Sequence, residues 1–336
     1  MTSPMAQPAE ADWSRALASI DRAERIWLAC HVRPDADALG SMLAFGTAIR
    51  TGRPDLPVVA SFGDDPFEVP RILDFLPGQP LLRPPAEYPA RPGVMVTFDA
   101  ASIDRLGLLA GPAQSAAELI VLDHHASNTG FGTINLVDPA AAATAVLAAE
   151  LISRLDISLT RDIALGLYTG LVTDTGSFRY SATTPQVHEL AARLLAAGLD
   201  AGAVSRELYD RAPFGYLKML AAALGRATLE PAAGGGAGLV WTTVTRADRA
   251  ADGLALDAAE SVIDVLRSTG EAEVAVVLKE DDEGIWQVSM RSKSVADVAA
   301  VATALGGGGH ARAAGFSYSG RLGEAVSSIL KCLDET

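Results

Sequence analysis

The sequence has little cysteine, few aromatic residues and only five histidines. The two cysteines, Cys30 and Cys332, lie near opposite ends of the 336-residue chain and make no disulfide framework, which favours a reduced, cytoplasmic protein. No uncharged apolar run of 18 residues occurs, and residues 1–12 contain neither a basic nor an apolar signal region. These absences predict a soluble protein that is neither exported nor bound to a membrane.

The chain also has fewer basic than acidic residues, 27 against 41, and its formal net charge is −14. Such a surface repels long polyanions and argues against a basic groove for duplex nucleic acid. A small phosphorylated substrate is compatible with this charge, because bound metal ions would reverse the sign of the local field. Hydrophobic residues make up 49% of the chain and aromatics only 6%, which is typical of an aliphatic α/β core, and the length predicts two domains.

Short apolar runs alternate with helical patterns in the first half of the chain. The runs predict buried strands at residues 26–30, 58–62, 94–98 and 119–122, and helices are expected at residues 41–50 and 140–154. This alternation predicts an α/β fold whose N-terminal sheet is mostly parallel and flanked by helices. Ligands bind such sheets at the carboxyl ends of the strands, and His31, Asp99 and Asp123 each follow an apolar run directly.

The second half of the chain predicts a helical connector and a smaller C-terminal α/β domain. Residues 185–230 have a helical pattern, and the glycine-rich residues 232–238 mark a turn. Beyond this turn we expect a strand at 239–245, a helix at 257–268 and a hairpin of strands 274–279 and 285–291. A helix should then run to Leu305 and begin with a capping box of Ser294 and Asp297. The last expected elements are a strand near Phe316 and a helix from about Gly323 to Leu333. The expected divisions are an N-terminal domain at 1–190, a connector at 191–235 and a C-terminal domain at 236–336.

The sequence Asp123-His124-His125 follows the apolar run 119–122. Two adjacent histidines at the end of a buried strand have no packing rationale, although one of the two rings could be a satisfied core histidine. Histidine is rare in this chain and is placed mostly in motifs of this kind, which indicates metal binding or proton chemistry.

Three further potential ligands, His31, Asp35 and Asp37, lie in one segment after the first strand. Pro34 stiffens that segment. Asp35 and Asp37 can face one cavity from a loop but not from a helix. The alternative is a helix N-terminus at which Asp37 is the cap and Asp35 is solvated.

Asp99 and Asp174 gain a functional interpretation only from the other motifs. Alone, Asp99 would be a turn former or a cap, and Asp174 would belong to the turn that ends a helix beginning near Asp162. Residues 306–309 are four consecutive glycines followed by His310. Their exposed N–H groups, and a helix that could begin just beyond them, would suit an anion; the alternative is a flexible linker.

Taken in order, these motifs resemble those of the DHH phosphoesterase family. Residues 31–41 resemble its first motif, Asp99 its second, residues 123–125 its third and Asp174 its fourth. The glycine run with residues 313–315 resembles the glycine-rich motif of the C-terminal DHH-associated domain. The resemblance extends from about residue 25 to about residue 317. Ala36 and Cys30 depart from the usual Gly and Ser, and because both are small we expect only modest effects on the loop.

The resemblance implies two Mn²⁺ ions, for which Mg²⁺ or Co²⁺ could substitute. The implied ligands are His31, Asp35 and Asp99 for one ion and Asp37, Asp99, His124 and Asp174 for the other, with Asp99 bridging. The implied catalytic residues are His125, Asp99 and Asp123, where Asp123 orients a neighbouring group and His125 faces the substrate phosphate. The implied substrate-binding residues are Asn128, Arg291, Gly307, Gly308, Gly309 and His310. For Arg291 the alternative is a solvated charge at a strand end.

Length and layout resemble the subgroup of this family that acts on small nucleotides. We therefore expect hydrolysis, by water activated between two metals, of short oligoribonucleotides, adenosine 3′,5′-bisphosphate (pAp) and linear or cyclic dinucleotides such as pApA and cyclic di-AMP. Family members often pair as homodimers. One rival is a processive single-strand exonuclease, which should carry an extra nucleic-acid-binding domain and a basic track. The other rival is a non-catalytic nucleotide sensor.

Overall fold

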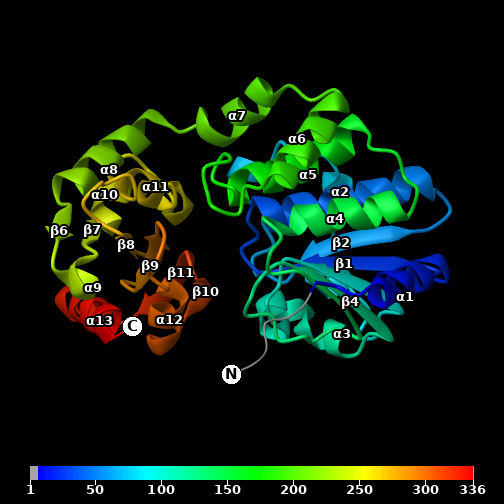
Figure 1. Cartoon of the computed structure of the whole chain (residues 1–336), viewed down its shortest axis with the longest axis horizontal. Coiled ribbons are helices and arrows are strands. Elements are labelled where there is room, and N and C mark those ends of the chain that lie inside the picture. The colour runs from blue at the N-terminus through cyan, green and yellow to red at the C-terminus, as the bar shows by residue number, and fades with distance from the viewer. Residues whose placement is uncertain (1–6, 336) are drawn as a thin grey trace. The chain divides into compact units, whose positions relative to one another are not determined.

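A computed structural model describes residues 7–335 of the chain, with the exception of the His310 side chain. The chain divides into two compact units, Met1–Arg211 and Ala212–Thr336 (Figure 1). The expected connector at 191–235 is divided between the two units. The predicted α/β class is confirmed.

The first unit contains a five-stranded, fully parallel sheet with the strand order β2-β1-β3-β4-β5. Its strands are β1 (Ile26–Cys30), β2 (Val58–Phe62), β3 (Val94–Phe98), β4 (Glu118–Asp123) and β5 (Ile134–Val137). The four predicted strands are confirmed. The edge strand β5 was missed, because its four residues are too few for a clear pattern. Because all strands are parallel, their carboxyl ends lie at one edge of the sheet.

Helices cover both faces of this sheet. Its helices are α1 (Glu10–Asp21), α2 (Ala36–Gly52), α3 (Ala110–Gln114), α4 (Thr144–Arg154), α5 (Arg161–Asp174), α6 (Pro185–Ala196) and α7 (Ala201–Tyr209), and its 3₁₀ helices are η1 (Arg71–Leu73), η2 (Gln79–Leu81), η3 (Pro85–Glu87) and η4 (Ile103–Leu109). Alternate strand residues such as Leu28 and Val96 pack in the core formed with α1, α2, α4 and α5. The residues between them, such as Ala29 and Met95, pack beside Leu106 on the other face. This period of two is what a strand buried on both faces requires.

The second unit contains a six-stranded mixed sheet with the order β10-β11-β9-β8-β7-β6. Its strands are β6 (Thr228–Glu230), β7 (Leu239–Val244), β8 (Val274–Glu280), β9 (Trp286–Ser292), β10 (Gly308–His310) and β11 (Ala313–Tyr318), and its helices are α8 (Phe214–Gly225), α9 (Ala233–Gly236), α10 (Arg246–Ala250), η5 (Leu256–Ala259), α11 (Val262–Leu266), α12 (Val298–Ala304) and α13 (Leu322–Glu335). The predicted hairpin is confirmed, since β8 and β9 pair antiparallel. The helix expected at 257–268 is interrupted and forms η5 and α11.

Two local predictions for the second unit are wrong. Asp297, not Ser294, is the N-cap of α12, and its carboxylate accepts hydrogen bonds from the N–H groups of Ala299 and Ala300. Ser294 is instead bound to Glu273, through both its N–H and its hydroxyl group. The residues after the glycine run do not begin a helix, because Ala313–Tyr318 pairs with β9 and forms a strand. Within residues 7–335, no helix is long and apolar enough to cross a membrane.

Candidate metal centre

The segment after β1 ends in the N-cap of α2. Asp35 is the cap, since its Oδ1 accepts hydrogen bonds from the N–H groups of Asp37 (3.1 Å) and Ala38 (3.0 Å). Asp37 lies in the first turn of the helix and is fully buried. The alternative with Asp37 as the cap is therefore wrong, and so is the expectation that both carboxylates need a loop. The cap places one carboxylate just outside the helix and the other within it.

Three strand ends bring polar side chains to one edge of the sheet. The last residues of β1 and β3, Cys30 and Phe98, are register partners, so that His31 and Asp99 emerge side by side. Asp99 has a φ of 57°, a left-handed conformation that aspartate tolerates better than most residues. Such backbone conformations cluster at functional sites.

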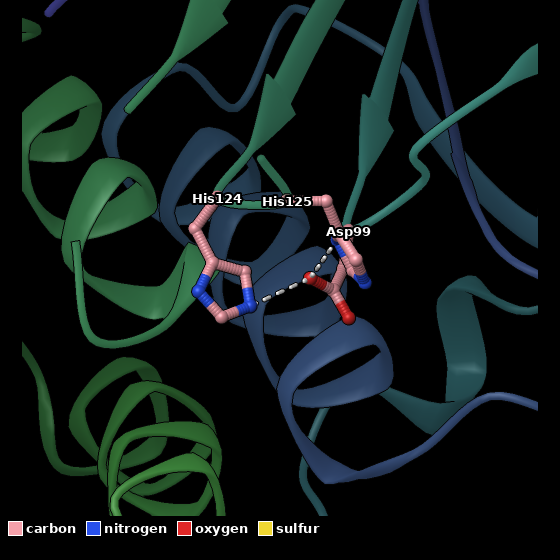
Figure 2. A group of neighbouring side chains, drawn as sticks. All are labelled: Asp99, His124 and His125. Atoms are coloured by element: carbon pink, nitrogen blue, oxygen red, sulfur yellow. Dashed lines mark ion pairs between the residues drawn. The ribbon is translucent and has the colours of Figure 1, made fainter. Parts of the chain in front are cut away.

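Two ligand groups share this edge, and Asp99 faces both of them. Its Oδ2 lies 3.5 Å from His31 Nε2, which is 3.7 Å from Asp35 Oδ2. Its Oδ1 lies 3.5 Å from His124 Nε2. Figure 2 shows His124 and His125 on either side of the Asp99 carboxylate. Asp99 therefore offers one oxygen to each side.

The second group gathers around His124. Its Nε2 lies 3.1 Å from Asp174 Oδ2 and 4.0 Å from Asp37 Oδ2. Potential ligand atoms lie within 4.8 Å of one another in each of three sets, which are His31, Asp35 and Asp99; Asp37, His124 and Asp174; and Asp99, His124 and His125. The structure thus brings together all six residues predicted to bind metal, from four different parts of the chain.

Backbone carbonyl groups fix the orientation of two imidazoles. His31 Nδ1 lies 2.8 Å from the carbonyl oxygen of Val32, and His124 Nδ1 lies 3.2 Å from that of Ala141. A carbonyl oxygen can only accept, so Nδ1 carries the proton in both contacts and Nε2 is directed at the carboxylates. This is the usual orientation of a metal-binding histidine.

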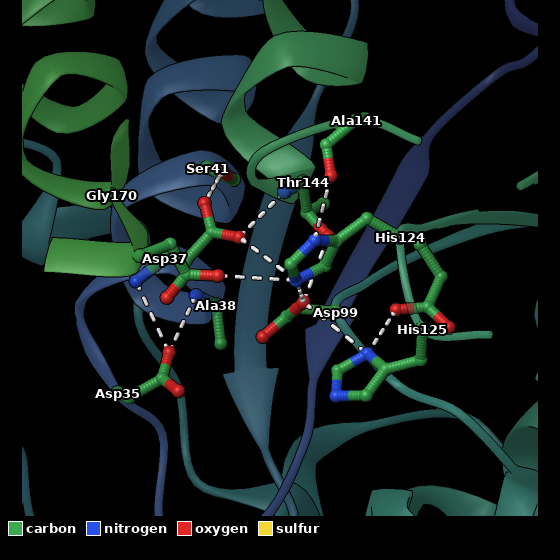
Figure 3. Close-up of polar contacts among 12 residues, drawn as sticks. Asp35, Asp37, Ala38, Ser41, Asp99, His124, His125, Ala141, Thr144 and Gly170 are labelled. Carbon is green, nitrogen blue, oxygen red and sulfur yellow. Dashed lines mark hydrogen bonds and ion pairs between the residues drawn. The ribbon is translucent and has the colours of Figure 1, made fainter. Parts of the chain in front are cut away.

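The N-terminus of α4 donates hydrogen bonds to two buried carboxylates, those of Asp37 and Asp99 (Figure 3). The N–H groups of Thr144 and Ala145 donate to Asp37 over 2.6 and 2.9 Å, and the Ser41 hydroxyl group donates over 3.1 Å. The Thr144 hydroxyl group donates to Asp99 Oδ1 over 2.8 Å. Sequence reasoning missed Thr144 and Ala145, because their contacts with Asp37 use backbone N–H groups, which carry no residue-type signal.

Helices α2 and α5 approach closely beside Asp37. A Cβ atom on Gly170 would lie 2.5 Å from Asp37 Oδ1, and one on Gly40 would lie 2.5 Å from the carbonyl oxygen of Gly166. Neither distance is sterically possible without movement. Glycine at position 170 therefore makes room for the Asp37 carboxylate, and this residue was also missed from sequence.

Asp123 connects His125 to Asn128. Its Oδ1 lies 2.6 Å from His125 Nδ1, and its Oδ2 accepts a hydrogen bond of 2.6 Å from Asn128 Nδ2. Asn128 Nδ2 also donates to the carbonyl oxygen of Ala100, while its Oδ1 accepts from the N–H of Gly130. Asp123 is fully buried and is thus placed to orient His125.

The concentration of buried charge shifts several pKa values. Burial, followed by the charges of Asp174 and Asp99, raises the pKa of Asp37 well above its usual value. Burial alone would lower the pKa of His31, but hydrogen bonds to Asp35 and Asp99 outweigh it and raise that pKa to about 10. The donors are carboxylates and imidazoles without thiolates, a set that suits divalent cations such as Mn²⁺ better than a structural zinc. Such cations would balance the carboxylate charge.

The remaining predicted residues lie in the second unit. Arg291 on β9 is in register with Ala313 on β11, which is in register with His310 on β10. The backbone at Gly307 passes so close to β11 that a Cβ atom there would lie 2.1 Å from the carbonyl oxygen of Gly315. The structure therefore brings Arg291 and the glycine run to the same end of one sheet. The side chain of His310 lies outside the described part of the chain.

Models of known protein families match residues in both units of the chain. The model of the DHH family, N-terminal domain, matches residues 25–171, and that of the DHHA1 domain matches residues 243–336. A bifunctional oligoribonuclease and PAP phosphatase NrnA from Thermus thermophilus is 32% identical and covers 92% of this chain and 89% of its own. A probable protein of the same name from Streptococcus mutans is 28% identical over 94% and 97%. An exopolyphosphatase-related protein from Bacteroides fragilis has the same fold, with a TM-score of 0.85, 23% identity and coverage of 97% and 96%.

Proposed function

Because this chain belongs to the DHH family of phosphoesterases, a family of metal-dependent hydrolases, and carries a DHHA1 domain, we propose that it hydrolyses short oligoribonucleotides and pAp. Two relatives named for these two activities match more than nine-tenths of the chain, which supports the proposal. Linear and cyclic dinucleotides, such as pApA and cyclic di-AMP, are proposed as further substrates. Their phosphodiester bonds are of the same chemical type as those of short RNA.

The observation that carries the proposal is the position of Asp99 between two ligand groups. One proposed ion is held by His31, Asp35 and Asp99, and the other by Asp37, Asp99, His124 and Asp174. The proposed metal is manganese, with Mg²⁺ or Co²⁺ as possible substitutes. When bound, such ions supply charge that acidifies water and offsets negative charge on phosphoryl oxygens.

The protein side chains contribute orientation and proton transfer. Asp123 binds His125 at Nδ1, which directs Nε2 away from Asp123. In our proposal His125 donates a hydrogen bond to a phosphoryl oxygen or protonates the leaving oxygen. Asn128 holds Asp123 in place and could also contact substrate.

The second unit is proposed to bind the nucleotide. Arg291 offers a guanidinium group that can pair with a phosphate, and Gly307, Gly308 and Gly309 offer backbone N–H groups. His310 would contact the phosphate or the base.

We also propose pairing as a homodimer, for which the exposed apolar residues Phe214 and Leu217 on α8 offer a surface. Sedimentation would test it, since a dimer has twice the 34.8 kDa mass of the chain.

The activity is tested with purified protein and Mn²⁺ on pAp, pApA and cyclic di-AMP. We expect release of phosphate from pAp and of mononucleotide from at least one dinucleotide. The Asp99→Asn variant should be inactive, whereas Asp104→Asn, which changes an exposed aspartate nearby, should keep wild-type activity. The proposal fails if no substrate is hydrolysed. Faster digestion of a long oligomer than of a dimer would favour the processive exonuclease.

A further inference from the structure

Two adjoining surface pockets lie at the amino ends of the strands of the first unit, opposite the metal centre. Their volumes are about 270 and 410 Å³, and both are lined by Ser19, Arg22 and Glu118. Val94 and Glu118 are the first residues of β3 and β4, whereas His31 and Asp99 of the metal centre follow the last residues of β1 and β3. Helix α1, which packs against β5 and α4, supplies Ser14, Arg15, Ala18 and Ser19 to the smaller pocket. We refer to this pair of pockets as the arginine pocket.

The arginine pocket contains basic side chains that are not neutralised within the described part of the chain. Arg22 makes no side-chain hydrogen bond or ion pair with any of residues 7–335. The Arg25 guanidinium group lies over the ring of Trp27, 5.5 Å from its centre, and has no carboxylate partner within the same residues. Because neither guanidinium group is paired with a carboxylate of the described chain, the two together offer positive charge to an anion that enters the pocket.

A second feature of the arginine pocket is the hydroxyl group of Ser19. Ser19 is only 4% exposed, and it lies on the wall that the two pockets share. Its hydroxyl group makes no hydrogen bond with any residue between 7 and 335. This hydroxyl group lines the pocket and its hydrogen-bonding capacity is not used within those residues, so it is available to a ligand that enters the pocket.

We propose that the arginine pocket binds the phosphate group of a small monophosphorylated ligand. Arg22 and Arg25 pair with the phosphate oxygens, and the Ser19 hydroxyl group donates a hydrogen bond to one of them. The carboxylates of Glu24 and Glu118 on the same walls repel further phosphates, which restricts the ligand to a single phosphate group. The larger pocket falls in the size range of small-molecule sites, so that it admits a nucleoside beside the phosphate.

Inorganic phosphate and a nucleoside monophosphate both carry the required group. Both are also products of the proposed reaction, and only this identification rests on the proposed function. The phosphate-binding chemistry of the pocket does not depend on it, because none of its residues lies in the metal centre.

The test follows the indole N–H resonance of Trp27 by NMR in the metal-loaded full chain, with inorganic phosphate, AMP and adenosine as probes. We expect the resonance to shift with phosphate and AMP but not with adenosine. In the double variant Arg22→Ala/Arg25→Ala the apparent affinity should fall at least tenfold, and in Ser19→Ala it should fall threefold to tenfold. Arg193→Ala, which removes an exposed arginine from α6, is the matched control and should behave as wild type.

Tighter binding of AMP than of phosphate would identify a nucleotide ligand, and equal binding would identify phosphate itself. A shift that survives in the double variant, or one that adenosine produces equally well, overturns the proposal. Hydrolysis of pApA by the double variant should stay within twofold of wild type, which also reports its folding. If wild type fails to hydrolyse any substrate but Trp27 still responds to phosphate, the proposed function fails and the arginine pocket stands.

Discussion

Gly170 on α5 lies against Asp37 on α2 so closely that an added Cβ atom would come within 2.5 Å of Asp37 Oδ1 (Figure 3). The Gly170→Ala variant must therefore displace a carboxylate that the N-terminus of α4 holds in place. We expect Mn²⁺ affinity and kcat to fall by at least tenfold, measured by metal titration and by hydrolysis of pAp. Gly111→Ala is the matched control, because this helical glycine has open space around its Cβ position. Equal behaviour of the two variants would contradict this role of Gly170.

The Thr144 hydroxyl group should matter through Asp99. Thr144→Val removes the hydrogen bond of 2.8 Å to Asp99 Oδ1 but keeps the side-chain shape, whereas Thr144→Ser keeps the donor. We expect Thr144→Val to weaken Mn²⁺ binding by about 10–100-fold, as is typical for groups that orient metal ligands, and Thr144→Ser to restore most of it. Electron paramagnetic resonance of free Mn²⁺ measures both affinities. If serine fails to rescue, the hydroxyl group is not the cause.

The contact between Asp123 and His125 predicts a separation of kcat from KM. Asp123→Asn keeps the size of the side chain but removes the negative charge that accepts the hydrogen bond from His125 Nδ1. His125 therefore loses its fixed orientation. We expect kcat to fall by about 10²–10⁴-fold, the usual contribution of a positioned acid or base, with KM changed less than threefold. Steady-state kinetics on pAp would show this, and an unchanged kcat would contradict the proposed role of His125.

Removal of divalent metal should lower thermal stability as well as activity. Asp37 and Asp99 are buried, together with His31 and His124, so that the centre contains concentrated charge that a cation would offset. We expect Mn²⁺ added to chelator-treated protein to raise Tm in a concentration-dependent way, measured by differential scanning fluorimetry. The Asp99→Asn variant should show a smaller increase. An equal Tm with and without Mn²⁺ would count against a metal centre here.

In the second unit, Glu273 should make stability depend on pH. Burial tends to raise the pKa of Glu273, but hydrogen bonds from the N–H groups of Ser294, Val295 and Ala296 outweigh it, and the pKa lies below its usual value of 4.5. Because the pKa of Glu273 is lower in the folded than in the unfolded state, the ionised carboxylate stabilises the folded protein. This stabilisation is complete above about pH 4.5 and is lost as the pH falls through the folded-state pKa.

The Glu273→Gln variant tests this contribution. We expect it to be less stable by about 1 kcal/mol near neutral pH, since the carboxylate is largely solvent-screened, and to lose less stability than wild type on acidification. Denaturant titrations at pH 7 and pH 4 would measure both effects, with Asp297→Asn, which changes only the N-cap of α12, as a comparison. Parallel losses in wild type and Glu273→Gln would contradict the assignment.

The sequence by itself determined four of the five strands in the sheet of the first unit and the edge at which its site lies. Apolar runs of four or five residues make buried strands, and parallel strands must end on the same side, so His31, Asp99 and Asp123 could be placed together from their positions after such runs. The hairpin of β8 and β9 was equally visible, because its turn and its alternation are local features.

Only the tertiary structure decided which groups hold those side chains. Thr144 and Ala145 lie more than 100 residues from Asp37 along the chain, and they bind it through backbone N–H groups that any residue but proline possesses. Ser294 was expected to cap a helix, but a glutamate from a neighbouring strand end occupies its donors. Local patterns determine which elements form, whereas backbone donors and close glycine contacts are assigned by long-range packing, which leaves no periodic trace in the sequence.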